Sequence, residues 1–210
     1  MVEFVDVSKF YSDRCVFSNV NFYIREGQLV QVSGGFACGK TTLLKLICRL
    51  EKPTSGEVKI FGESLNRIRY SRLTLLRRHI GVVFDDFGLI ENLSALSYLR
   101  LVTKLLKRKQ YLEEAIDIFD MSNLLDTKIY NLSISEKYKL ALARILALRV
   151  PLVLLDEPFS YYKHSQELIS ILKKLNEDYK MTIVFSSFTP IESICLLYTS
   201  DAADDLLCVD

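Results

Sequence analysis

The sequence predicts an α/β fold in which a mostly parallel core sheet carries a phosphate-binding loop. Short apolar runs bounded by turn residues alternate with segments that place apolar residues at helical spacing. One apolar run leads into a glycine-rich loop, and another ends in two adjacent carboxylates. Strands that alternate with helices favour parallel pairing, because each helix returns the chain to the start of the next strand.

The first sixty residues predict short strands separated by turns. Strands are expected at residues 2–7, 20–25 and 28–33, where β-branched and aromatic residues are frequent. Residues 53–62 predict a further strand, because proline and glycine bound and interrupt an otherwise apolar segment.

The middle of the chain predicts helices around one short strand. Residues 69–79 are polar and predict a helix, and residues 80–84 predict a buried strand that two aspartates follow. Residues 93–126 carry apolar side chains with a period of about 3.6, which predicts a helical insert. Another helix is expected at 133–148, because residues 133–136 fit the S-x-x-E capping box at its start.

The loop after the strand at 28–33 is the most informative segment, because it reads G-x-x-x-x-G-K-T. Its residues are Gly34, Gly35, Phe36, Ala37, Cys38, Gly39, Lys40 and Thr41. Backbone N–H groups of such a loop converge on phosphate oxygens at a helix N-terminus, where the helix dipole favours an anion. Lys40 is expected to reach the β- and γ-phosphates, and the Thr41 hydroxyl to ligate Mg²⁺. An ordinary glycine-rich turn is the alternative, but the full pattern between a strand and a helix favours a nucleoside triphosphate site.

Two carboxylates at the end of a second apolar run predict the other half of this site. Residues 152–155 and 181–185 both predict buried strands, and Asp156 and Glu157 directly follow the first of them. A phosphate-loop ATPase needs an acid that organises Mg²⁺ and a base for the attacking water. Asp156 fits the first role and Glu157 the second, so Glu157 and Lys40 are the candidate catalytic residues. A solvated Asp-Glu turn is the alternative.

Composition limits the remaining function classes. The 210 residues carry 27 basic and 26 acidic side chains, a net charge of +1. This balance gives no strong case for nucleic-acid binding, because a nucleic-acid-binding face should show as a basic patch. The five arginines of residues 67–78 are instead expected to form a solvated helix face. No run of about twenty apolar residues is present, and the N-terminus opens on a strand pattern. The five cysteines lack a C-x-x-C pair, so a cytoplasmic location is expected.

Short motifs along the chain, added to the phosphate loop and the two carboxylates, indicate a family. Residues 7–11, 53–57, 80–84 and 141–144 match its pattern, and the chain resembles the ATP-binding subunits of ATP-binding-cassette (ABC) transporters over nearly its whole length. Residues 76–87 look most similar to the cell-division branch, the ATP-binding protein FtsE. The lipoprotein-releasing and macrolide-exporter subunits are near relatives of that branch.

The resemblance implies ATP and Mg²⁺ as ligands and a head-to-tail dimer, homomeric or heteromeric, that encloses two ATP molecules. It also implies a membrane-spanning partner, either FtsX-like or a permease, and a peripheral position on the inner face of the cell membrane. The core sheet would be joined by an N-terminal antiparallel β subdomain and by a helical subdomain at about 88–148. Tyr11 would stack on adenine, Thr42 would help to hold the phosphates, and Ser133 would act across the dimer on the partner's ATP.

Five positions depart from the family pattern, and they affect hydrolysis more than binding. Ala37 replaces a loop glycine, and Asp85 replaces a glutamine, although its carboxylate could still ligate Mg²⁺. Ile134 and Lys163 replace a signature glycine and an aspartate, and Phe188 replaces the histidine expected beside the γ-phosphate. Slow hydrolysis is therefore expected. The alternatives are near-normal hydrolysis, or a nucleotide-dependent scaffold in which hydrolysis is incidental.

The last residues predict a foreign tail. Residues 195–205 resemble the in-frame translation of a transposase-type sequencing adaptor. Residues 1–194 are therefore expected to form a single ABC-type ATP-binding domain, and residues 195–210 are excluded from the site arguments.

Overall fold

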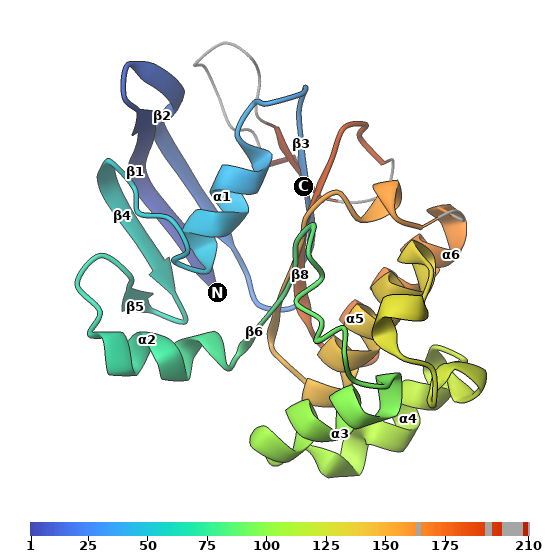
Figure 1. Cartoon of the computed structure of the whole chain (residues 1–210). Coiled ribbons are helices and arrows are strands. Elements are labelled where there is room, and N and C mark those ends of the chain that lie inside the picture. The colour runs from blue at the N-terminus through green and yellow to red at the C-terminus, as the bar shows by residue number, and fades with distance from the viewer. Residues whose placement is uncertain (163–164, 192–194, 199–207, 210) are drawn as a thin grey trace.

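The computed structural model describes residues 1–162, 165–191, 195–198 and 208–209. Among these residues the strands form two sheets, which lie side by side in Figure 1. The smaller sheet is antiparallel with the order β2-β1-β4-β5. Its strands are β1 (Val2–Tyr11), β2 (Arg14–Ile24), β4 (Ser55–Ile60) and β5 (Glu63–Ser64). This sheet is the predicted N-terminal antiparallel β subdomain.

The larger sheet has the order β10-β9-β3-β8-β7-β6, and all its pairings are parallel except that of β10 with β9. Its strands are β3 (Leu29–Ser33), β6 (Ile80–Val83), β7 (Leu152–Leu155), β8 (Thr182–Ser187), β9 (Cys195–Tyr198) and β10 (Cys208–Val209). Because β3 and β7 both pair with β8 in parallel, their carboxyl ends meet at one edge of the sheet. That edge carries the phosphate loop after β3 and the two carboxylates after β7.

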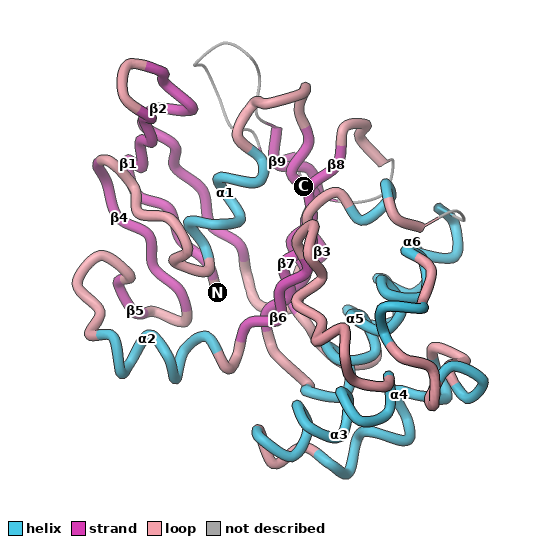
Figure 2. Tube along the Cα trace, in the orientation of Figure 1, coloured by secondary structure: helices cyan, strands magenta, loops and turns pink. Residues whose placement is uncertain are grey.

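Helices cover both faces of the larger sheet, as Figure 2 shows. The α-helices of the described residues are α1 (Lys40–Ile47), α2 (Tyr70–Arg77), α3 (Ala95–Leu105), α4 (Leu112–Ile118), α5 (Ile134–Leu148) and α6 (Ser165–Glu177). Helix α1 lies between the two sheets, where Leu43, Leu44 and Ile47 are fully buried against strands of both. Burying three such side chains contributes on the order of 5 kcal/mol, which fixes the helix that follows the phosphate loop.

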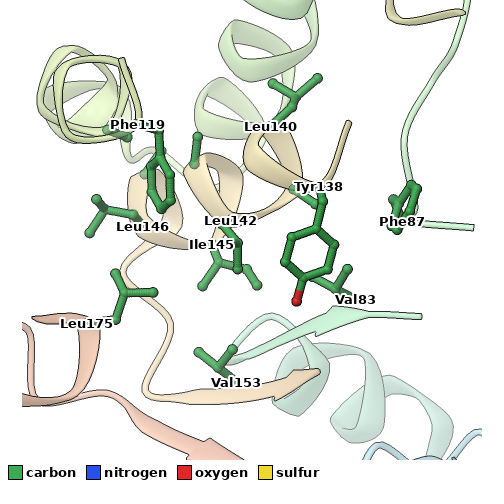
Figure 3. Close-up of a cluster of buried hydrophobic side chains, with 14 of the residues drawn as sticks. Val83, Phe87, Phe119, Tyr138, Leu140, Leu142, Ile145, Leu146, Val153 and Leu175 are labelled. Carbon is green, nitrogen blue, oxygen red and sulfur yellow. The ribbon is translucent and has the colours of Figure 1, made fainter. Parts of the chain in front are cut away.

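The opposite face of the larger sheet carries the helical part of the chain. Helix α5 packs its apolar side on the sheet, and Figure 3 shows Leu142 and Ile145 above Val83 and Val153. Helices α3 and α4 pack in turn on α5. The predicted helical insert at 93–126 is confirmed as α3 and α4 with short 3₁₀ turns between and after them.

The start of α5 confirms the predicted capping box in both halves. The Ser133 side chain accepts a hydrogen bond from the Glu136 backbone N–H, and the Glu136 carboxylate accepts one from the Ser133 N–H. By contrast, β2 begins at Arg14, well before the predicted residue 20. The first half of β2 is largely exposed, so its sequence lacks the apolar pattern of a buried strand. It is a strand because it pairs with β1 in a hairpin, from Tyr11↔Arg14 onward.

The five arginines are mostly exposed as predicted, but they do not form one helix face, because only Arg72 and Arg77 lie within α2. Arg67, Arg69, Arg72 and Arg78 are exposed, whereas Arg77 is partly buried and donates to the carbonyls of Cys48 and Arg49 after α1. No helix among the described residues is long and apolar enough to cross a membrane.

The predicted tail lies partly outside the described residues, because 199–207 and 210 are not described. Residues 195–198 form β9 beside β3. Their origin from adaptor sequence stays a prediction, which re-reading the gene beyond the Ile194 codon would test.

Candidate functional site

The phosphate loop joins the end of β3 to the start of α1 through two left-handed residues. Gly39, the N-cap of α1, has φ 101°, and a Cβ there would lie 2.4 Å from Val16 Cγ1. Only glycine fits that position without moving β2. Ala37 has φ 59°, so the position where the family uses glycine does require a positive φ. With a Cβ, this left-handed conformation costs about 1 kcal/mol in backbone strain. The packed strand before the loop and the helix after it impose the conformation despite that cost.

Lys40 is the charged residue of the loop, and its side chain is only 6% exposed. Its Nζ donates to the backbone oxygens of Gly34 and Gly35, at 2.8 and 2.9 Å. The same Nζ lies 3.2 Å from Glu157 Oε1 and 4.2 Å from the centre of the Phe188 ring. Burying an ammonium is unfavourable unless it is paired, so these contacts stabilise the Lys40 charge at the end of the loop.

The two carboxylates after β7 have different surroundings. Asp156 is 3% exposed, and its Oδ1 accepts a hydrogen bond of 2.6 Å from Ser186 Oγ. Ser186 Oγ itself accepts the Glu157 N–H at 2.7 Å, which holds Glu157 in a left-handed conformation with φ 45°. Burial raises the pKa of Glu157, and the Asp156 charge adds to this, while Lys40 opposes it. A base with a raised pKa is suited to accept a proton near neutral pH.

Asp85 follows β6 and lies on the same cleft, bound to a residue that the sequence did not point to. Tyr161 donates its hydroxyl to Asp85 Oδ1 at 2.8 Å. Burial and the Asp85 carboxylate raise the pKa of Tyr161 to about 12, so the phenol keeps its proton and remains a donor. One oxygen of Asp85 is thus already occupied within the chain.

These groups surround one cleft of about 530 Å³ at the edge of the larger sheet. Its lining residues are Tyr11, Arg14, Val16, Phe36, Ala37, Cys38, Gly39, Lys40, Thr41, Thr42, Asp85, Asp156, Glu157 and Phe188. The structure therefore brings together nearly all the predicted site residues, with Gly34 and Gly35 behind the cleft as acceptors for Lys40. Their roles toward a ligand stay predictions.

Sequence reasoning missed three polar residues of this site. Ser186 links the two carboxylates, Tyr161 binds Asp85, and Arg14 donates to the Ala37 carbonyl at 3.3 Å. Only Ser186 had a local signal, as a polar residue at the carboxyl end of a buried strand beside the Asp-Glu pair. The other two reach the site through the tertiary fold.

Ser133 lies elsewhere, at the exposed N-terminus of α5, and does not line the cleft. Its Oγ donates to Glu136 Oε2 at 2.7 Å, so the hydroxyl is bound to its own helix cap. Ile134 beside it is 62% exposed. Lys163, which replaces an aspartate of the family pattern, lies outside the described residues.

Comparison with known proteins agrees with this geometry. Residues 17–160, which include the phosphate loop and both carboxylates, match the family model described as ABC transporter. The chain belongs to the ABC transporter family. It is an ATP-binding subunit with the ABC cassette fold.

Curated relatives of this ABC subunit include several import ATP-binding proteins. The phosphonates import protein PhnC of Lactobacillus delbrueckii subsp. bulgaricus is 33% identical over 88% of this chain and 78% of its own length. The methionine import protein MetN of Legionella pneumophila is 31% identical over 88% of this chain but only 56% of its own length. These importers do not single out the FtsE branch, which the sequence favoured.

Two solved structures of one bacterial ABC cassette, MJ0796, cover nearly all of this subunit. A dimeric structure has 30% sequence identity and a TM-score of 0.84, covering 96% of this chain and 95% of that one. A post-hydrolysis dimer bound to ADP and phosphate has 29% identity, a TM-score of 0.84 and full coverage of both chains.

The residues at the cleft fit a magnesium ion. Mg²⁺ prefers oxygen ligands and is bound by one or two carboxylates together with substrate phosphates and water. Thr41 and Asp156 offer a hydroxyl and a buried carboxylate on the same cleft. Among the described residues no group of three or more acidic, histidine or cysteine side chains is placed to hold a metal ion.

Proposed function

We propose that this ABC subunit binds Mg²⁺-ATP in the cleft and hydrolyses it slowly, to drive or gate a membrane-spanning partner. The observation that carries the proposal is the ion pair of Lys40 with Glu157, 3.2 Å apart at the end of the phosphate loop. A phosphate-binding cation and a base with a raised pKa face the same point, which is where the γ-phosphate would lie.

Each group at the cleft then has a separate task. Tyr11 stacks on adenine, and the backbone of residues 34–41, with Lys40 and Thr42, binds the phosphates. Thr41 and Asp156 hold Mg²⁺, which supplies charge neutralisation at the phosphates when it is bound. Glu157 accepts a proton from the attacking water, and the Asp85 oxygen that Tyr161 leaves free is a further candidate ligand of Mg²⁺.

Phe188 and α5 support slow turnover. The Phe188 ring lies over Lys40, where a histidine would supply a hydrogen-bond donor toward the γ-phosphate. Losing one preorganised donor costs about 10²–10³ in rate. Glu136 adds a second weakness, because it binds the Ser133 hydroxyl that would otherwise be available to a partner's nucleotide.

A dimer is part of the same proposal. MJ0796 is described as a dimeric cassette, and its fold matches this chain almost throughout. In a head-to-tail dimer the exposed N-terminus of α5, with Ser133, would face the cleft of a second ATP-binding subunit, either a copy of this chain or a relative. The membrane-spanning partner would hold the assembly on the inner face of the cell membrane.

The finer role we propose is FtsE-like, with an FtsX-like partner in cell division, because residues 76–87 resemble that branch. The import relatives favour a second candidate, a nutrient importer with a permease partner. Deletion of the gene in its source organism separates the two. Filamentous cells with normal uptake of phosphonate and methionine support division, whereas an uptake defect with normal cell length supports import.

Steady-state Mg²⁺-ATP turnover by the purified chain, measured beside ATP binding by calorimetry, tests the biochemical proposal. We expect binding together with slow turnover that Glu157→Gln removes. Binding without turnover would instead support a nucleotide-dependent scaffold, and absence of ATP binding would contradict the proposal as a whole.

A further inference from the structure

A buried lysine lies behind the residue proposed to stack on adenine. Lys9 is two residues before Tyr11 on β1, and its side chain is only 10% exposed. Its Nζ donates to Glu51 Oε2 at 3.0 Å and to the Lys52 carbonyl at 2.9 Å, and it lies over the Tyr11 ring, 4.5 Å from the centroid. Lysine is rarely buried unless its charge is paired, and here the pairing places the charge on an aromatic face.

The partners of Lys9 belong to the segment that leaves α1. The N–H groups of Leu50 and Glu51 both donate to the Lys45 carbonyl in the last turn of that helix, at 2.8 and 3.1 Å. The residue that binds Lys9 is therefore hydrogen-bonded to the last turn of the helix that begins at the phosphate loop.

The same segment is fastened to β1 beside Lys9. Thr54 donates its N–H to the Ser8 carbonyl at 2.8 Å, and its Oγ1 accepts the Phe10 N–H at 3.0 Å. Residues 50–54 thus tie the far end of α1 to the strand that carries Tyr11. The two ends of a bound nucleotide, its base and its phosphates, would rest on elements joined through this one connection.

Tyr11 lines the cleft and Lys9 does not. The ammonium thus lies over one face of a residue that lines the cleft, without lining the cleft itself. A cation on a ring face is attracted by the ring quadrupole, and this attraction restrains the rotation of an otherwise exposed tyrosine. Restraint before binding lowers the entropy that stacking must overcome.

We infer that Lys9 and Glu51 are positioning residues for base recognition, which fix the Tyr11 ring at a set distance from the phosphate loop. This inference rests on the proposed binding of ATP in the cleft. Lys9 touches neither base nor phosphate and acts only through Tyr11 and the segment after α1.

Separate probes for the two ends of the nucleotide test the inference. Magnesium tripolyphosphate occupies only the phosphate subsite, whereas Mg²⁺-ATP occupies both, and calorimetry measures each with the full chain. We expect Lys9→Met to weaken ATP binding about fivefold, the size of an exposed cation–π contact, and to change tripolyphosphate binding by less than about twofold.

Lys59→Met is the matched control, because Lys59 pairs with Glu3 and Glu57 in the same sheet and does not line the cleft. It should leave both affinities unchanged. A second comparison uses Tyr11→Ala, which removes the ring. Adding Lys9→Met to that variant should have almost no further effect on ATP binding, because the two residues act as a unit.

Several outcomes would overturn the inference. Equal losses for ATP and tripolyphosphate would make Lys9 a purely structural residue, and a loss that persists without the Tyr11 ring would show that it acts elsewhere. If Lys9→Met does not fold, Glu51→Gln keeps the shape of the pair and should give a smaller loss with the same selectivity for ATP. If the wild-type chain binds tripolyphosphate as tightly as ATP, the inference alone is refuted. If it binds neither ligand, both the inference and the proposed function are refuted.

Discussion

The cleft and the N-terminus of α5 carry the two parts of one proposed reaction, but their polar groups differ in burial and in where they come from in the sequence. In the cleft, Lys40 and Glu157 are mostly buried and converge on a common point. At α5, Ser133 and Glu136 are held by each other, with the Ser133 hydroxyl donating to the Glu136 carboxylate. The first pair brings distant residues together on a cleft large enough for a ligand, whereas the second pair forms within one exposed helix turn.

The difference indicates which function is strong in the single chain. Groups that the main chain and a packed core hold in place bind a ligand at little cost in ordering. Lys40 and Glu157 exchange their ion pair for contacts with a nucleotide in their own cleft, whereas Ser133 loses a bond of its own helix cap for a contact that needs a second subunit. We therefore expect ATP binding to be robust and the contribution of α5 across a dimer to be weak.

The largest expected effect on ATP binding comes from removing the cation of the cleft. Lys40→Ala should weaken ATP binding about 10²-fold, because charge-assisted hydrogen bonds to phosphate contribute about 1.5–3 kcal/mol. Calorimetric titration with Mg²⁺-ATP measures the effect. Lys45→Ala, in the last turn of the same helix, is the control and should bind ATP normally. Near-normal ATP binding by Lys40→Ala would contradict the expectation that the buried groups of the cleft provide most of the ATP affinity.

Glu157→Gln should lower turnover about 10²–10³-fold while ATP binding persists, since it removes the base and keeps the side-chain shape. The raised pKa of Glu157 gives this prediction a pH dependence. Wild-type turnover should rise as the pH rises through that pKa, above the ordinary value of 4.5, because only the carboxylate accepts a proton. Turnover in Glu157→Gln that matches wild type would assign the base to another group.

Stability should change in the opposite direction over the same pH window. The folded chain binds a proton at Glu157 more tightly than the unfolded chain does, so this group favours folding less as the pH rises from about 4.5 through the raised pKa. Urea unfolding of wild type and Glu157→Gln at several pH values measures the difference. Parallel stability profiles for the two chains would contradict a raised pKa.

The sequence predicted the local parts of this comparison well. The loop from Gly34 to Thr41, the Asp156–Glu157 pair and the capping box are contiguous patterns, so their chemistry is visible in the order of residues. The parallel sheet was also predicted, because alternating strands and helices require it. What brings the loop beside the carboxylates is the strand order β3-β8-β7, which no contiguous pattern encodes.

Contacts between distant residues were the part that could not be predicted. Tyr161 reaches Asp85 across 76 residues of sequence, and Ser186 reaches Asp156 across 30. The sequence showed that Phe188 replaces a histidine. It did not show that the Phe188 ring packs over the Lys40 ammonium, because no sequence pattern predicts such a contact. These contacts depend on tertiary packing, which decides the partner of each polar group.

Phe188→His should raise turnover about tenfold or more, because it adds a hydrogen-bond donor where a phenyl ring now covers Lys40. Phe188→Leu is the control. It removes the ring without adding a donor, so it should leave turnover unchanged or raise it only slightly. A steady-state assay at saturating Mg²⁺-ATP measures both. An equal rise in the two variants would show that the ring obstructs the site rather than that a donor is missing.

The smallest expected effect lies at α5, where Glu136→Gln removes a charge but keeps an oxygen that can cap the helix. Hydrogen bonds from the Ser133 hydroxyl and N–H lower the pKa of Glu136, so its carboxylate is ionised throughout the working pH range. In the proposed dimer that charge would lie near a partner's triphosphate. Neutralising one like charge at a surface is worth about 1 kcal/mol, and ATP-dependent dimerisation should rise about fivefold.

Sedimentation of Glu136→Gln in a Glu157→Gln background measures this association without turnover. Stability should change by less than about 0.5 kcal/mol, because the cap remains. Glu136→Ala releases the same charge but loses the capping partner, at about 1 kcal/mol of stability. If charge limits the dimer, both variants should associate more tightly than the parent, and the gain should shrink at high salt. A gain confined to Glu136→Ala would instead show that α5 is limited by the rigidity of its cap, since only that variant frees the Ser133 hydroxyl.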